Sequence, residues 1–124
     1  MPEKSNLTIL LVDDDPVILE LGRELLTHLE YRVETASDAA QALEAFQKQR
    51  TDLVLLDYQL PGMDGYQLFQ KLRALDAGVK VLIASGFLSE RQVARLREGG
   101  VRGIIYKPFR LAELQRQIQA ALVR

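Results

Sequence analysis

Carboxylates, a hydroxyl and a lysine occur directly after hydrophobic runs that have the length of β-strands. They are Asp13 and Asp14 after residues 8–12, Asp57 after residues 53–56, Ser85 after residues 79–84, and Lys107 after residues 104–106. Parallel strands all end at the same edge of a sheet, where open α/β folds bind their ligands. We therefore expect these side chains to meet in one small crevice.

Crowded carboxylates repel one another, and their pKa values rise unless a cation lies between them. Mg²⁺ suits such a group because it takes a few oxygen ligands, keeps several waters and often binds phosphate oxygens. Histidine and cysteine do not occur among these residues, which argues against zinc or copper. Lys107 is then available for an incoming anion, and an aspartate can serve as the nucleophile. The pattern predicts a phosphoryl-transfer site.

Taken singly, each of these residues has a simpler explanation. An aspartate between a strand and a helix is usually a helix cap, the role we assign to Asp15, Asp38 and Asp64. A serine before a glycine is usually a turn residue, and a lysine is usually exposed. The shared position at the ends of four strands favours the functional interpretation. His28 is expected to be partly exposed near the end of a helix, with no role as a ligand or a phosphorylated residue.

The rest of the chain alternates between strand and helix patterns. Strands are predicted at residues 8–12, 32–35, 53–56, 79–84 and 104–106, and helices follow each of them, the last at residues 111–122. Ile18, Leu21, Leu25 and Leu29 are expected to form the apolar stripe of the first helix. Ser37 is a further candidate cap, for the second helix, and residues 89–92 have the spacing of a capping box that starts the fourth helix. Five strands alternating with five helices predict a three-layer α/β sandwich with a parallel sheet.

The length of 124 residues predicts one domain over residues 1–124, with polar residues 1–6 as a disordered lead-in. The net charge of −1 gives no reason to expect direct binding to nucleic acid or to a membrane surface. The sequence contains no cysteine, no signal-peptide pattern and no apolar run of the roughly 20 residues that cross a bilayer. We therefore expect a cytoplasmic protein.

The sequence resembles the receiver domains of response regulators over essentially its whole length. The motifs that carry the resemblance are residues 11–16 (LVDDDP), 55–57 (LLD), 60–65 (LPGMDG), 85–86 (SG) and 107–109 (KPF). Each motif is weak alone, but their order and spacing together are specific. The resemblance implies the flavodoxin-like (βα)5 fold with strand order 2-1-3-4-5.

The resemblance also implies roles for the residues at the strand ends. Asp57 would accept the phosphoryl group from a phosphohistidine of a histidine kinase or a histidine phosphotransfer domain. Asp14 would bind Mg²⁺ directly, Asp13 partly through water, and the backbone carbonyl of Gln59 would be a further ligand. Lys107 would pair with the phosphoryl oxygens, and the Lys107–Pro108 bond is expected to be cis.

The switch of the family is implied as well. The Ser85 hydroxyl would move to the phosphoryl group and remodel the face formed by the fourth helix, the fifth strand and the fifth helix. That face would bind a downstream effector protein or a second copy of the chain. Gln59 and Phe87 would lie over the phosphoryl group and influence how fast water removes it.

Two positions depart from the pattern of the family. Ile104 occupies the place of its aromatic switch residue, and the neighbouring Tyr106 should not be mistaken for it. The usual coupling of hydroxyl movement to a ring is therefore in question, whereas phosphorylation is not. Arg110 occupies the place of a capping serine or threonine, so the start of the fifth helix is expected to be less well satisfied.

Three rival functions remain to be weighed. A phosphatase of the dehalogenase-like class would need a general-acid aspartate where this chain has Gln59, so at most slow self-dephosphorylation is expected. The triply acidic loop after residues 8–12 would repel a flavin phosphate. A degenerate receiver that acts only as a protein-interaction module is the third alternative. Residues 82–90 and 106–108 look most like receivers at the C-terminus of hybrid sensor histidine kinases.

Overall fold

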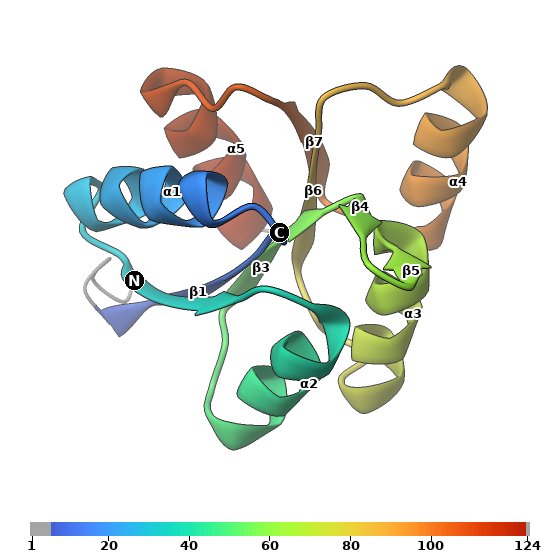
Figure 1. Ribbon diagram of the computed structural model, residues 1–124, viewed down its shortest axis with the longest axis horizontal. Helices are drawn as coiled ribbons and strands as arrows, with labels where there is room; N and C mark the ends of the chain where they lie inside the picture. Colours follow the sequence, from blue (N-terminus) through green and yellow to red (C-terminus); the bar gives the residue numbers. More distant parts are fainter. Residues whose placement is uncertain (1–5, 124) are drawn as a thin grey trace.

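The computed structural model of the protein describes residues 6–123. Within this range, five parallel strands form a sheet in the order β2-β1-β3-β6-β7 (Figure 1). They are β1 (Thr8–Val12), β2 (Arg32–Ala36), β3 (Leu53–Asp57), β6 (Val81–Ser85) and β7 (Gly103–Tyr106). Numbered along the chain, the order is 2-1-3-4-5, which confirms the expected topology.

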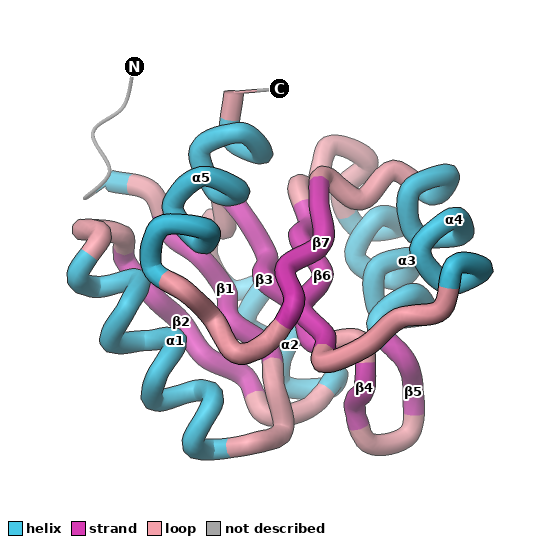
Figure 2. The backbone as a smooth tube through the Cα atoms, turned by 90° about the horizontal axis from the view of Figure 1, so that it is seen from above, coloured by secondary structure: helices cyan, strands magenta, loops and turns pink. Residues whose placement is uncertain are grey.

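The helices cover the two faces of this sheet. They are α1 (Pro16–His28), α2 (Ala39–Lys48), α3 (Gly65–Leu75), α4 (Glu90–Gly99) and α5 (Leu111–Leu122). Helices α1 and α5 lie on one face, and α2, α3 and α4 lie on the other (Figures 1 and 2). Side chains of β1 point alternately to the two faces of the sheet. Ile9 and Leu11 pack in the core beneath α1 and α5. Leu10 and Val12 pack in the core on the other face, beneath α2, α3 and α4. The predicted three-layer sandwich is confirmed.

Acidic and hydroxyl caps start the helices that lead away from the strand ends. Asp15 accepts a hydrogen bond from the Val17 N–H, with Pro16 in the first position of α1. Asp64 at α3 and Ser89 at α4 each form a capping box with a glutamine three residues later. These predicted caps are confirmed, and they fix where each loop above the sheet turns into a helix.

Ser37 does not cap α2. The carboxylate of Asp38 accepts the hydrogen bond from the Gln41 N–H, at 2.8 Å, while the N–H and hydroxyl of Ser37 both donate to the Gln41 side-chain oxygen. Asp38 has the extended backbone of a cap. The serine therefore lies one residue outside the helix and reinforces a cap that its neighbour provides.

The buried face of α1 includes much of the predicted stripe but is broader: Leu29 is buried, and Ile18 and Leu25 pack against the same core. Gly22 and Leu26 are the buried residues within the helix, whereas Leu25 is only partly buried. The helix lies close to β1 at Gly22, where a Cβ atom would be 2.5 Å from a methyl group of Leu11. The glycine lets the helix pack closely on β1, and the buried face therefore extends to Gly22 and Leu26.

Some element boundaries also differ from the prediction. The fourth parallel strand begins at Val81 rather than residue 79, and it includes Ser85. The segment after Asp57 contains a short antiparallel pair that was not predicted, β4 (Gln59–Leu60) and β5 (Met63–Asp64), which projects beyond the sheet in Figure 2. Gly100 ends α4 in a left-handed conformation. Arg110, as expected, makes no capping bond to α5 among the residues described.

Across residues 6–123, no helix combines the length and the apolar composition needed to cross a membrane. Asn6 is exposed. The rest of the predicted lead-in, residues 1–5, lies outside the described residues.

Candidate functional site

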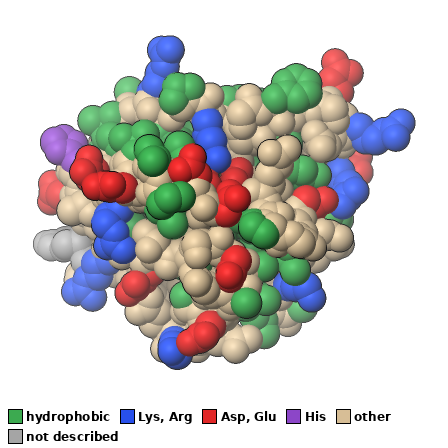
Figure 3. Space-filling view, in the orientation of Figure 1, with side chains coloured by type: hydrophobic (Ala, Val, Ile, Leu, Met, Phe, Trp, Pro, Cys, Tyr) green, Lys and Arg blue, Asp and Glu red, His purple; other side chains and the backbone are tan. Residues whose placement is uncertain are grey.

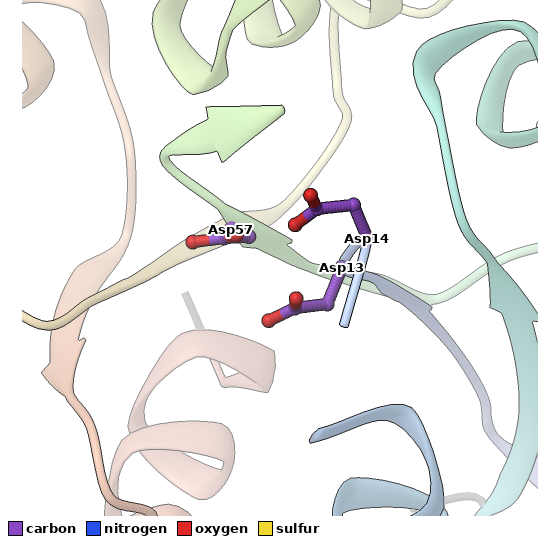
Figure 4. Close-up of side chains that lie close together, drawn as sticks. All are labelled: Asp13, Asp14 and Asp57. Atoms are coloured by element: carbon purple, nitrogen blue, oxygen red, sulfur yellow. The ribbon is translucent and has the colours of Figure 1, made fainter. Parts of the chain in front are cut away.

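The aspartates that follow β1 and close β3 meet above the sheet. Each of Asp13, Asp14 and Asp57 offers a carboxylate oxygen, and these oxygens all lie within 4.8 Å of one another. Figure 4 shows the three side chains directed into the same space. The strand pairing produces this arrangement, since Val12 pairs with Leu56 and thus brings the ends of β1 and β3 side by side.

Lys107 reaches the same place from the end of β7. Its Nζ lies 2.6 Å from Asp13 Oδ2 and 3.2 Å from Asp57 Oδ1. The lysine is therefore already engaged by two carboxylates, whereas the sequence had suggested a cation left free for an incoming anion. In Figure 3, acidic side chains gather near the middle of the visible face with a basic side chain beside them.

Burial and mutual repulsion set the charge state of the acidic group. Asp57 is 6% exposed and Asp13 is 2% exposed. Burial raises the pKa of Asp57, the charge of Asp13 raises it further, and Lys107 only partly offsets these effects. Burial by itself would lower the pKa of Lys107, but its bonds to Asp13 and Asp57 outweigh that effect and raise it. The site is thus an acidic centre with too little positive charge.

Backbone groups act on two of the carboxylates. Asp13 Oδ1 accepts a hydrogen bond from the Asp15 N–H at 2.9 Å, and the backbone of Gln59 lowers the pKa of Asp57 and thus offsets part of its rise. Asp14 is exposed, and among residues 6–123 no group donates a hydrogen bond to its carboxylate or forms an ion pair with it. Its oxygens are therefore available for a further ligand.

Ser85 is buried at the end of β6. Its hydroxyl donates to the Phe87 carbonyl at 2.9 Å and accepts from the Phe87 N–H at 3.2 Å. The hydroxyl therefore closes a local turn while bordering the same cavity as the acidic residues. It can exchange these local bonds for a bond to an anion in the cavity without leaving its strand.

A cavity of about 460 Å³ opens above these side chains. The residues lining it are Asp13, Asp14, Asp15, Asp57, Gln59, Leu60, Pro61, Ser85, Gly86 and Lys107. The sequence had pointed to all of the charged residues in this set. It had named Leu60, Pro61 and Gly86 only as parts of the motifs at residues 60–65 and 85–86, with no role in the site.

The two residues expected to lie over the phosphoryl group, Gln59 and Phe87, differ in position. Gln59 borders the cavity, whereas Phe87 is not among its lining residues and is 78% exposed. Ile104 is buried in the core, and Tyr106, two residues later on β7, is 51% exposed. The aromatic ring of this strand is therefore half exposed, on the same face of β7 as the buried Ile104.

The donor set fits a hard divalent cation. The three convergent carboxylates supply only oxygen ligands, and no histidine or cysteine joins them among the described residues. The raised pKa of Asp57 shows that its negative charge is poorly compensated, which a cation would relieve. Mg²⁺ has this ligand preference, whereas zinc favours nitrogen and sulfur.

A larger surface hollow, of about 620 Å³, lies near the opposite edge of the sheet. Its lining includes Arg50 and Asp52, which pair with each other at 3.2 Å, and Lys80, which donates to the Leu122 carbonyl. These polar groups already have partners, and the hollow lies where the parallel strands begin. The acidic cavity is therefore the stronger candidate site.

Comparison with known proteins gives a consistent result. The family model described as the response regulator receiver domain matches residues 9–119. The chain is 36% identical over 118 residues to the probable transcriptional regulatory protein TcrX of Mycobacterium tuberculosis, covering 94% of this chain and 50% of that protein. It is 32% identical over 117 residues to sporulation initiation phosphotransferase F of Bacillus subtilis, covering 94% of both.

A solved structure shows the same architecture. The response regulator TrrA of Thermotoga maritima, in complex with Mg(2+)-BeF, superposes with a TM-score of 0.84 at 28% identity and covers 94% of this chain and 99% of that one. The chain spans about half the length of several curated relatives that it matches.

Proposed function

The chain belongs to the response regulator receiver family, and we propose that Asp57 is the residue that accepts its phosphoryl group. A receiver domain is a phosphoacceptor of two-component signalling rather than an enzyme that turns over an external substrate. The observation that carries the assignment to Asp57 is its position at the end of the central strand β3, buried beneath the cavity. Asp13 and Lys107 flank it there.

The transfer that we propose exchanges one bond to phosphorus for another. A carboxylate oxygen of Asp57 attacks the phosphorus of a phosphohistidine, the N–P bond breaks, and the imidazole of the partner takes up a proton from solvent. Lys107 turns from the carboxylates to the phosphoryl oxygens and offsets their negative charge. The raised pKa of Asp57 reflects burial and the nearby charge of Asp13, so a bound cation would favour the ionised carboxylate that makes the attack.

Asp14, Asp13, Asp57 and the backbone carbonyl of Gln59 would hold Mg²⁺ at this site. When bound, the ion would neutralise the carboxylates and orient the oxygens of the phosphoryl group. The complex of TrrA with Mg(2+)-BeF supports such a cation in this family. Of the proposed protein ligands, Asp14 needs no rearrangement, since it has no other partner in the described part of the chain.

We propose that Ser85 reports the phosphorylated state to the surface. Its hydroxyl would leave the Phe87 backbone and bond to the phosphoryl group, which draws the loop after β6 inward. The face made by α4, β7 and α5 would change with it. Phe87 and Tyr106 are exposed beside this face and offer apolar contact to a downstream effector or to a second copy of the chain.

The partner that supplies the phosphoryl group would be a histidine kinase or a histidine phosphotransfer domain. If this domain is joined to another in a longer protein, that other domain would set the output of the whole protein. A place at the C-terminus of a hybrid sensor histidine kinase, a single domain over residues 1–124 and a cytoplasmic location stay predictions. The alternative is a receiver that acts only as an interaction module and is never phosphorylated. A phosphorylation assay distinguishes the two.

The protein is incubated with Mg²⁺ and phosphoramidate, and its intact mass is measured beside Asp57→Asn and a matched control, Asp64→Asn. We expect a base-labile phosphoryl adduct on the parent and on the control. The adduct should not form when EDTA replaces Mg²⁺, and it should be absent from Asp57→Asn. Asparagine caps a helix as well as aspartate does, so the control keeps α3 intact. An adduct that persists on Asp57→Asn would place the acceptor elsewhere.

A further inference from the structure

The end of the phosphoacceptor strand is in direct contact with the start of α3. The Gly65 N–H donates to the carbonyl of Tyr58, the residue after Asp57, at 2.6 Å. A Cβ atom on Gly65 would lie 2.8 Å from the Tyr58 Cα and 3.0 Å from the Asp57 carbonyl oxygen. Backbone therefore packs on backbone at this point, and a shift at the end of β3 must move the first turn of α3.

The first turn of α3 is well able to transmit such a shift. Asp64 and Gln67 bond to each other's backbone N–H groups in a capping box, each at 2.9 Å. These bonds fix the turn to the helix that follows it. Tyr66 lies within this turn and belongs to the same rigid unit.

Helix α4, in contrast, has little core of its own. Leu96 is its only buried residue among those described, and most of the helix is polar. Its position therefore depends on contacts with neighbouring elements, and α3 is the helix beside it in both views (Figures 1 and 2).

One arginine–aromatic pair and one arginine hydrogen bond join these helices. The Arg95 guanidinium carbon lies 4.0 Å from the centroid of the Tyr66 ring. Arg73 lies 5.7 Å from the centroid of Phe69 and donates to the carbonyl of Gly99 at the end of α4. The Arg73–Phe69 pair lies within α3, so we call the Arg95–Tyr66 pair and the Arg73–Gly99 bond the α3–α4 contact. A cation and the face of an aromatic ring attract each other even near the protein surface, and a planar guanidinium can also stack on the ring.

Gly99 brings the end of α4 close to the same rings. A Cβ atom there would lie 3.1 Å from Tyr66 and 3.3 Å from Phe69. Tyr58 strengthens the connection from its buried position. Burial raises the pKa of its hydroxyl, and the groups acting on that hydroxyl come from both helices: Asp64 at the cap of α3, and Arg95 and Gln92 on α4.

We infer that α3 relays the phosphorylation of Asp57 to α4 through the α3–α4 contact, in addition to the movement of Ser85. This inference rests on the proposed phosphorylation of Asp57. The route needs no aromatic residue on β7, because it runs from the end of β3 through Gly65 and Tyr66 to Arg95. It assigns to Tyr66 and Arg95 a positioning role at a distance from the acidic cavity.

The test compares amide hydrogen exchange of residues 90–99 with and without phosphoramidate and Mg²⁺, and the intact mass of each sample gives the phosphorylated fraction. The variants are Tyr66→Leu, Arg95→Gln and the pair combined. Arg91→Gln is the control, because it removes an exposed arginine of α4 that lies outside the α3–α4 contact.

We expect equal adduct formation in all samples. The phosphorylation-dependent change in exchange across α4 should fall by about two- to fivefold in each single variant and stay unchanged in the control. The combined variant should lose little more than either single one, since the two residues form one contact. Adduct on every variant with an undiminished response of α4 would overturn the relay alone. Absence of adduct from the parent would overturn the proposed function and the relay with it.

Discussion

Lys107 lies nearer to Asp13 than to Asp57: its Nζ is 2.6 Å from Asp13 Oδ2 and 3.2 Å from Asp57 Oδ1. The unphosphorylated site is therefore held together by a cation whose shorter bond is to a proposed metal ligand rather than to the proposed acceptor. This arrangement ties the end of β7 to the end of β1 across the sheet, so stability, the proposed metal binding and the proposed phosphorylation all involve Lys107.

Replacing Lys107 with methionine should destabilise the protein by about 1–3 kcal/mol in the presence of EDTA. The substitution leaves two buried carboxylates without their cation, and this range is below the roughly 3–5 kcal/mol of a fully buried pair because the lysine is partly exposed. Urea unfolding measures the change. Lys48→Met breaks only the exposed pair with Glu44 and should leave the midpoint unchanged. Equal effects of the two substitutions would contradict the role of Lys107.

Asp57 should make the protein less stable as the pH rises. Its pKa in the folded state is raised above the value near 3.8 of an exposed aspartate, so the folded state holds the proton more tightly. Its contribution is fully present below pH 3.8 and is lost as the pH rises through the raised pKa. Without divalent cations, Asp57→Asn should therefore gain stability relative to the parent across this window. Unfolding free energies measured from pH 3 to pH 7 test this, and a pH-independent difference would contradict it.

Mg²⁺ should stabilise the parent by mass action, by roughly 2.7 kcal/mol at a concentration one hundred times its dissociation constant. Asp14→Asn should lose most of this gain, because it removes a carboxylate that has no other partner in the described part of the chain. Asp15→Asn carries the same charge change one residue later and keeps the cap of α1. Thermal unfolding with Mg²⁺ or EDTA distinguishes them. The assignment of Asp14 fails if the control loses the Mg²⁺ effect equally.

Gly65→Ala should cost about 1–3 kcal/mol, because the added methyl group meets backbone that cannot move without shifting β3 or α3. Gly86→Ala is the matched control at the rim of the same cavity, where a Cβ atom would meet nothing within 4 Å. Chemical denaturation of both variants gives the comparison. Similar stabilities would show that the start of α3 is less tightly packed on Asp57 and Tyr58 than the structure indicates.

Glu30→Gly should stabilise the protein by about 1 kcal/mol. Glu30 follows α1 with a φ of +72°, a left-handed conformation that is unfavourable for residues with a side chain. Its N–H bonds to the Thr27 carbonyl and that of Tyr31 to the Leu26 carbonyl, so the turn itself is well formed. Glu20→Gly, in the middle of α1, should instead destabilise by about 0.5–1 kcal/mol. A loss of thermal stability in Glu30→Gly would rule out strain at this position.

The sequence was most informative where structure depends on near neighbours. The caps at Asp15, Asp64 and Ser89 were predictable because a cap needs only a side-chain oxygen two or three residues before the N–H that it accepts from. Where two neighbours compete, as Ser37 and Asp38 do, the pattern alone did not decide between them. The stripe of α1 was predicted only in part, because the burial of Gly22 follows from its contact with Leu11 on another element.

The gathering of Asp13, Asp14, Asp57, Ser85 and Lys107 at one edge was determined by the sequence itself, because parallel strands separated by helices must all end on the same side. Their strand order followed only from family resemblance. Which charges pair, and how closely, was decided by tertiary structure: Lys107 reaches Asp13 over 94 positions of sequence, and Arg95 stacks on Tyr66 from another helix. Periodicity reports which face of an element is buried, but it carries no information about the distance between elements, and ion pairs and ring contacts depend on that distance.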